Sequence, residues 1–171
     1  MFTGDKVLLR PVRREDLEAL HAWKVDPELW QLGSDEPVVP VSFEAYLRAW
    51  AERSDHDAAE FAIEVDGRLI GRCGLFDIDL LARSGMVGIT IGDRDAWGHG
   101  YGSDSLRTLV RYAFTIRNLQ RVWLDTLAAN HRGLLAYRAA GFVEEGRLRR
   151  HAWVDGAYDD VVVMGILRDD V

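Results

Sequence analysis

The sequence is poor in residues that mark several common classes of protein. Its 171 residues include a single cysteine, Cys73, so the chain can form neither an intrachain disulfide nor a cysteine metal cluster. Cys73 lies in the strand-like run LIGRCGLF, where we interpret it as a small buried residue rather than a nucleophile. The five histidines show no metal-ligand spacing, and we therefore predict no metal site.

Positive charge is also scarce. Lysine and arginine total 21 against 28 aspartates and glutamates, for a formal net charge of −7. A nucleic-acid-binding protein normally has a basic face, so we expect no nucleic-acid partner. Cationic partners would be attracted to such a molecule, whereas an anionic ligand would need a dedicated local site.

Long apolar runs are missing as well. No run approaches the roughly 18 residues that span a bilayer, and the opening segment MFTGDKVLLRPVRRED has no apolar signal core. We therefore expect a cytoplasmic protein with no membrane segment. The composition, 48% hydrophobic and 29% charged, is that of a globular protein, and the length suits one domain over residues 1–171.

Hydrophobic periodicity predicts a mixture of strands and helices. Asp66-Gly67 and Asp155-Gly156 are typical hairpin turns. Strands alternate with helices only in the second half of the chain, which indicates a mixed sheet with helices on both faces rather than a doubly wound parallel fold. The predicted strands cover residues 6–10, 61–65, 68–76, 85–92, 121–127, 142–154 and 158–168, and the predicted helices cover 14–23, 42–53, 101–116 and 131–140.

A glycine-rich segment, AWGHGYGS at residues 96–103, joins a predicted strand to a predicted helix. Glycine lets the backbone curl and approach a ligand closely, and the free N–H groups of a helix N-terminus favour phosphate. The spacing is not G-x-G-x-x-G and no Walker lysine follows, which excludes the dinucleotide and P-loop interpretations. A turn that merely needs glycine remains the alternative.

Two motifs resemble those of a known family. WGHGYGSDS at 97–105 resembles the W-G-x-G-Y-x-[ST]-E-A pyrophosphate loop of GNAT acetyltransferases, especially the ribosomal-protein and spermidine acetyltransferase groups. NHRGLLAYRAAGF at 130–142 resembles the family pattern N-x-x-[SAG]-x-x-x-Y-x-x-x-G-F. The resemblance covers about residues 61–168. Asp95 departs from the usual Gln or Arg, and Asp104 replaces the common Glu.

The resemblance implies a fold and a way of binding the acetyl donor. The fold would be the α/β GNAT fold: a mixed, mostly antiparallel sheet of six or seven strands with four helices, in which strands 85–92 and 121–127 splay apart. The strand Ile89, Thr90 and Ile91 would bind the pantetheine arm of acetyl-CoA through its backbone, and one of its N–H groups would polarise the thioester carbonyl. The remaining implied cofactor-binding residues are Trp97, Gly98, His99, Gly100, Tyr101, Gly102 and Ser103 for the pyrophosphate, together with Asn130.

Three residues have competing interpretations. Asn130 precedes a helix and suits an N-cap, a role compatible with cofactor contact. Tyr137 is either a buried tyrosine or, by resemblance, the general acid, because a phenol of pKa about 10 can protonate a thiolate whose conjugate acid has a pKa of about 8.5. Asp125 is either a salt-bridged or solvent-facing strand residue or the general base that the protonated acceptor amine requires.

The expected function is transfer of an acetyl group from acetyl-CoA to a primary amine, by direct attack in a ternary complex. The amine is a protein N-terminus or a small cationic amine; alternatives are a non-catalytic acyl-CoA-binding module or, within enzymes, a polyamine or aminoglycoside acetyltransferase. Dimers are common among proteins of this family, so a homodimer is a further expectation from the resemblance. Trp30, Trp50, Asp35 and Glu36 fall in the half that borders the acceptor groove in relatives, where an acidic, aromatic lining would suit a cation; ordinary core tryptophans are the alternative.

Overall fold

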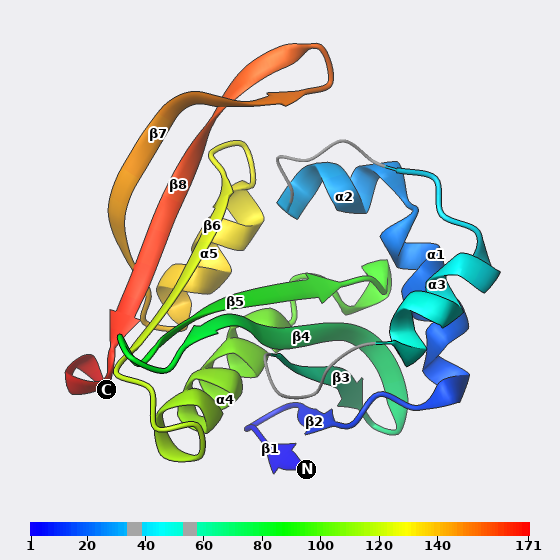
Figure 1. Cartoon of the computed structure of the whole chain (residues 1–171), viewed down its shortest axis with the longest axis horizontal. Coiled ribbons are helices and arrows are strands. Elements are labelled where there is room, and N and C mark those ends of the chain that lie inside the picture. The colour runs from blue at the N-terminus through cyan, green and yellow to red at the C-terminus, as the bar shows by residue number, and fades with distance from the viewer. Residues whose placement is uncertain (34–38, 53–57) are drawn as a thin grey trace.

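The computed structural model describes residues 1–33, 39–52 and 58–171. Its strands form one twisted sheet, against which the helices pack (Figure 1). The strands are β1 Phe2–Thr3, β2 Leu8–Arg10, β3 Ala59–Val65, β4 Arg68–Asp79, β5 Ser84–Ile91, β6 Arg121–Leu127, β7 Val143–Val154 and β8 Ala157–Leu167. The helices are α1 Leu17–Lys24, α2 Pro27–Gly33, α3 Phe43–Ala51, α4 Tyr101–Thr115 and α5 His131–Ala139, with 3₁₀ turns at Arg14–Asp16, Arg94–Ala96 and Arg168–Asp170.

The strands follow the order β1-β2-β3-β4-β5-β6-β8-β7. In the described part of the chain every neighbouring pair is antiparallel except β5 and β6, which are parallel. The predicted mixed, mostly antiparallel sheet is therefore confirmed, but it has eight strands rather than six or seven. The additional strand, β1, has only two residues, too few for an alternating pattern to reveal it.

The helix count also differs from the expected four, since the described residues contain five α-helices. The missed helix is α2, whose seven residues are too few to show a periodic stripe. Its start nevertheless carries a recognisable signal, with Pro27 in the first position and Asp26 before it. The Asp26 carboxylate accepts hydrogen bonds from the backbone N–H groups of Glu28 and Leu29 at 3.0 and 3.1 Å, which is the usual cap of a helix N-terminus.

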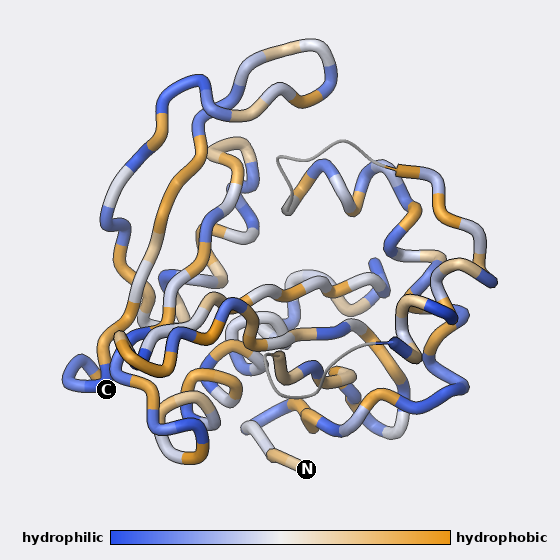
Figure 2. The backbone as a smooth tube through the Cα atoms, in the orientation of Figure 1, coloured by the Kyte–Doolittle hydropathy of each residue, from blue (hydrophilic) through white to orange (hydrophobic). Residues whose placement is uncertain are grey.

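The main core lies between the sheet and α4. Alternate residues of β4 and β5, among them Cys73, Leu75 and Val87, are buried against the stripe of α4 that includes Leu106 and Leu109. Helices α1 and α2 lie over the opposite face of β4 and β5, so helices cover both faces as predicted (Figure 1). Figure 2 shows the contrast between β8, with its long hydrophobic stretch, and the edge strand β7, which is largely hydrophilic.

The start of α4 is tied to the N-terminal strands by a buried carboxylate. Asp104 accepts hydrogen bonds from the backbone N–H groups of Lys6 at 2.7 Å and Val7 at 3.1 Å, and it also accepts one from Asp5. A Cβ on Gly4 would lie 2.5 Å from the Asp104 carboxylate, so the chain passes too close there for any side chain. These contacts fix the helix whose N-terminus follows the glycine loop.

Among the described residues, no helix is both long enough and apolar enough to cross a membrane.

Candidate active site

The central feature of the site is an opening between two parallel strands. Strands β5 and β6 pair only over 84–86 and 121–123. Beyond that point β5 continues beside β4 and β6 continues beside β8, so the two strands separate as predicted. A cavity of about 370 Å³ lies here between the end of β5, the start of α4 and α5, and we call it the cleft cavity.

The glycine loop forms one wall of the cleft cavity. Gly98 and Gly100 have φ values of 79° and 81°, in the left-handed region that favours glycine. Gly100 is the N-cap of α4, and the N–H of Asp104 is bonded to its carbonyl. The N–H groups of 101–103 belong to the first helical turn and have no intrahelical acceptor. The loop therefore presents backbone donors at the positive end of a helix, as the motif predicts.

Trp97 connects this loop to β5. Its indole N–H donates to the carbonyl of Ile91 at 2.8 Å, and the guanidinium carbon of Arg132 lies 3.4 Å from a ring centroid. The guanidinium carbon of Arg94 lies 5.7 Å from a ring centroid of the same tryptophan. Arg94 also forms ion pairs with Asp26 and Glu28 at the start of α2. Two cations are thus held near the rim of a cavity in a molecule of net negative charge.

A buried hydrogen-bonded chain crosses the floor of the cleft cavity. The Asn130 side chain accepts from the N–H of Gly133 at 2.9 Å, which confirms the predicted N-cap, and donates to the Thr126 hydroxyl at 3.0 Å. The Tyr137 hydroxyl is hydrogen bonded to Thr126 as well. Burial raises the pKa of Tyr137 to about 12, the hydrogen bond opposes this, and the charge of Asp125 adds to it. Tyr137 is therefore a protonated donor at neutral pH.

Most of the sequence-predicted site residues come together around this cavity. Ile89, Thr90 and Ile91, the loop residues 97–103 except His99, and both Asn130 and Tyr137 line it. His99 is exposed, with Nδ1 2.8 Å from the carbonyl of Trp97. Asp125 is also exposed on β6 and lines neither cavity described here.

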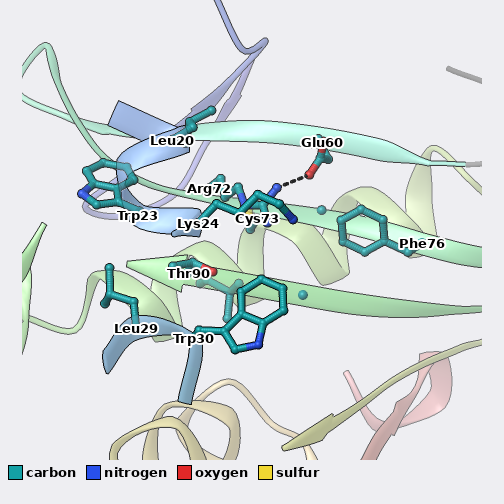
Figure 3. A pocket seen from close by; sticks show the side chains of 13 residues that line it. Leu20, Trp23, Lys24, Leu29, Trp30, Glu60, Arg72, Cys73, Phe76 and Thr90 are labelled. Atoms are coloured by element: carbon teal, nitrogen blue, oxygen red, sulfur yellow. Dashed lines mark hydrogen bonds and ion pairs between the residues drawn. The ribbon is translucent and has the colours of Figure 1, made fainter. Parts of the chain in front are cut away.

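A second cavity, of about 230 Å³, lies on the face of β4 and β5 that α1 and α2 cover (Figure 3). Trp23, Trp30 and Phe76 are among its lining residues, and we call it the aromatic cavity. It shares Leu29, Ile89 and Thr90 with the cleft cavity. The two cavities therefore adjoin at the end of β5.

Strand register explains the floor of the aromatic cavity. Glu60 of β3, Gly74 of β4 and Gly88 of β5 lie in one row across three strands. A Cβ on Gly74 would lie 2.7 Å from the Phe76 ring and one on Gly88 would lie 3.3 Å from it, so this ring rests on the glycine pair. Arg72 donates to the Glu60 carboxylate at 3.0 Å. The floor thus combines an aromatic ring with an ion pair.

The acceptor-side residues suggested by the sequence separate in the structure. Trp30 lines the aromatic cavity, whereas Trp50 lines neither cavity and lies against Tyr46 at a ring distance of 6.1 Å. Asp35 and Glu36 lie outside the described residues. Sequence reasoning missed Glu60 and Arg72, although charged residues inside the apolar strands AEFAIEV and RLIGRCGLF were a usable signal.

Within residues 1–33, 39–52 and 58–171, no three histidine, cysteine, aspartate or glutamate side chains are grouped so that they could hold a metal ion.

Known acetyltransferases are similar to this chain in sequence and in structure. Spermidine N(1)-acetyltransferase of Escherichia coli (strain K12) is 30% identical over 176 residues, covering 98% of this chain and 89% of that protein. The putative ribosomal N-acetyltransferase YdaF of Bacillus subtilis (strain 168) is 28% identical over 177 residues, covering 98% and 96%. The crystal structure of spermidine N-acetyltransferase from Vibrio cholerae in complex with CoA and spermine has a TM-score of 0.89 at 27% identity, covering 98% of both chains.

A model of the family described as "Acetyltransferase (GNAT) domain" matches residues 6–143. The match begins ahead of β2 and ends at the start of β7, so it includes both sequence motifs and the walls of both cavities. Acetyl-CoA is the donor of this family. The chain therefore belongs to the GNAT acetyltransferase family and is an N-acetyltransferase.

Proposed function

We propose that this N-acetyltransferase holds acetyl-CoA in the cleft cavity and acetylates a small primary amine held in the aromatic cavity. The observation that carries the proposal is the contact between the two cavities, which share Leu29, Ile89 and Thr90. A donor and an acceptor bound on the two sides of these residues meet directly, so no covalent enzyme intermediate is needed.

The donor side fits an anionic, extended molecule. The free N–H groups at the start of α4 suit a diphosphate, and Arg132, which also lines the cavity, adds a positive charge. Gly102 leaves room for close approach, since a Cβ there would meet no atom nearer than 3.8 Å.

The backbone of β5 supplies the next group. The Ile91 carbonyl accepts from Trp97 and so faces the cleft rather than β4. Successive residues of a strand direct their backbone groups to opposite edges, so residues two apart share an edge. The N–H of Ile89 therefore faces the cleft as well. We assign this N–H to the thioester carbonyl, where it stabilises the developing negative charge.

Proton transfer requires one group on each side. When bound, acetyl-CoA supplies an acetyl thioester whose leaving sulfur needs a proton, and the Tyr137 hydroxyl donates it from the floor of the cleft cavity. The acceptor arrives protonated, since a lysine-like amine has a pKa near 10.4. Glu60 lines the aromatic cavity and is placed to accept that proton, whereas Asp125 lines neither cavity and acts on the site through the pKa of Tyr137.

The size of the aromatic cavity favours a small molecule over a protein N-terminus. Its volume of about 230 Å³ is bounded by α1 and α2 as well as the sheet, whereas a peptide needs a longer open groove. Among small primary amines, a polyamine is favoured by the relatives that are spermidine acetyltransferases.

A thiol-release assay with acetyl-CoA tests the proposal directly. The panel contains small amines, polyamines, aminoglycosides and peptides with free N-termini. We expect release with small amines, and we expect Tyr137→Phe to lower kcat at least about tenfold with little change in the Kd for CoA. Tyr158→Phe is the matched control, because Tyr158 is exposed on β8 and lines neither cavity. Normal turnover of Tyr137→Phe would remove this residue from the mechanism.

Two further expectations stay predictions. The homodimer is tested by the molar mass from light scattering during size-exclusion chromatography. The cytoplasmic location is tested by fractionation of the cells that produce the protein.

A further inference from the structure

Thr126 introduces a hydroxyl group into the apolar face of β6. The same face carries Val122 and Leu124, which are buried in the main core, and Thr126 itself is 3% exposed. Valine would also suit this position, because it has the branched shape of threonine and a similar preference for strands. A buried hydroxyl is unfavourable unless it is hydrogen bonded, so the role of this one should follow from its partners.

The direction of its first hydrogen bond is determined by the cap of α5. The side-chain oxygen of Asn130 accepts from the backbone N–H of Gly133 at 2.9 Å, and a backbone N–H can only donate. The other end of the Asn130 amide is therefore its NH2 group, which donates to the Thr126 hydroxyl oxygen at 3.0 Å. Because Thr126 accepts in this contact, its own hydroxyl proton is available for a second partner.

The second partner is Tyr137 of α5. Burial raises the pKa of Tyr137, and the hydrogen bond with Thr126 lowers it. A hydrogen bond lowers the pKa of an acid when it stabilises the deprotonated form, so Thr126 donates and the phenolic oxygen accepts. The phenolic proton is not used in this bond and can be directed into the cleft cavity, which Tyr137 lines.

We infer that Thr126 is a positioning residue, which orients the Tyr137 hydroxyl so that its proton points into the cleft cavity toward the leaving sulfur of acetyl-CoA. The inference rests on the proposed function, in which Tyr137 protonates that sulfur. Thr126 lines neither cavity, so it acts on the reaction through Tyr137 and touches neither substrate. Asn130 holds the threonine hydroxyl from the other side and thereby connects the cap of α5 to the direction of proton delivery.

Proton delivery by Tyr137 balances over the reaction. The nitrogen lone pair of the amine forms the C–N bond, the C–S bond breaks with its electrons going to sulfur, and the sulfur takes the Tyr137 proton. The ammonium nitrogen loses two protons in total, of which one restores Tyr137 by way of solvent and the other is released. While Tyr137 lacks its proton, the hydrogen bond donated by Thr126 stabilises the phenolate.

Two substitutions of Thr126 separate the effect of its hydroxyl from that of its shape. Thr126→Val removes the hydroxyl and keeps the branched side chain, whereas Thr126→Ser keeps the hydroxyl. In the thiol-release assay we expect Thr126→Val to lower kcat at least about tenfold with little change in the Kd for CoA, and Thr126→Ser to stay within about threefold of wild type. Thr108→Val is the matched control, because Thr108 is a buried threonine that lines neither cavity and donates to the carbonyl of Asp104.

Combination with Tyr137→Phe shows whether Thr126 acts through the tyrosine hydroxyl. We expect Thr126→Val to change kcat by less than about twofold in the Tyr137→Phe background, since residues that act through one group are not additive. If Thr126→Val fails to fold, Thr126→Ala takes its place in both backgrounds. Equal losses of kcat in the two backgrounds, or normal kcat in folded Thr126→Val, overturn the inference and leave the proposed function standing. Normal turnover of Tyr137→Phe instead removes the proposed role of Tyr137 and the inference with it.

Discussion

Gly102 offers a direct test of the donor site, because the structure predicts opposite effects of one methyl group on stability and on binding. Gly102 is in the first turn of α4 and lines the cleft cavity. A Cβ at this position would meet Ile91 at 3.8 Å and Ala136 at 3.9 Å, which are ordinary van der Waals contacts. Its φ is not positive, unlike those of Gly98 and Gly100. Gly102→Ala is therefore compatible with the fold.

The size of both effects follows from these contacts. Alanine in place of glycine in a helix stabilises by about 0.5–1 kcal/mol, which for a chain of this length raises Tm by about 1–4 °C. The same methyl occupies space that a diphosphate needs in order to reach the N–H groups of the turn. We expect the KM for acetyl-CoA to rise at least about tenfold, equivalent to about 1.4 kcal/mol of binding, with kcat little changed.

Thermal unfolding without ligand and a titration with CoA measure the two effects separately. Gly146→Ala is the control, since a Cβ there would meet no atom within 4 Å and Gly146 lies on β7, away from both cavities. A higher Tm together with unchanged CoA affinity would show that the diphosphate does not lie against this turn. A lower Tm would show instead that the turn lacks the room described here.

Three further predictions concern protons. Burial alone would raise the pKa of Asp104, but hydrogen bonds from backbone N–H groups and Arg107 hold this pKa below its usual value. The stabilisation by the Asp104 carboxylate is therefore complete above about pH 3.9 and is lost as the pH falls through the lower folded-state pKa. Urea unfolding of Asp104→Asn should show a free energy of unfolding about 1–3 kcal/mol lower than wild type at pH 7 and a smaller difference in acid. Because the pKa of Tyr137 is raised to about 12, wild-type stability should fall between about pH 10 and that value, and Tyr137→Phe should show a smaller fall in the same alkaline unfolding series. Glu60→Gln should slow thiol release at least about tenfold at neutral pH, whereas Asp125→Asn should stay within about threefold of wild type; the reverse order would make Asp125 the base.

The parts of the fold that the sequence predicted are those in which one period extends over many residues. The stripe of α4 and the alternation in β6 place apolar residues on one buried face, while β3 and β4 are recognisable as apolar runs with consecutive buried residues. The Asp-Gly turns determine how the hairpins close. Helix α2 and strand β1 were missed because seven residues and two residues are too short for either period to appear. Short elements owe their structure to tertiary contacts rather than to local pattern.

The walls of the cleft cavity were predictable for a related reason. The loop before α4 and the Asn130 cap need particular residue types within a few positions of each other, because backbone conformation and helix capping are local. The floor of the aromatic cavity was not predictable in this way. Glu60 and Arg72 meet only because β3 and β4 pair in one register, and the glycines beside them become a floor only when Phe76 folds over them.

In the proposed reaction, the position of β5 lets one short segment serve both substrates. A strand in the middle of a sheet normally has both edges occupied by neighbours, but β5 loses β6 after its third residue and keeps β4 along its length. Its end therefore has a free backbone edge toward the cleft cavity, while the face that carries Thr90 and Gly88 turns to the aromatic cavity. Donor and acceptor can thus be recognised by different groups of the same residues, the main chain for one and the strand face for the other. Substitutions on that face should change the choice of amine while leaving the binding of the donor intact.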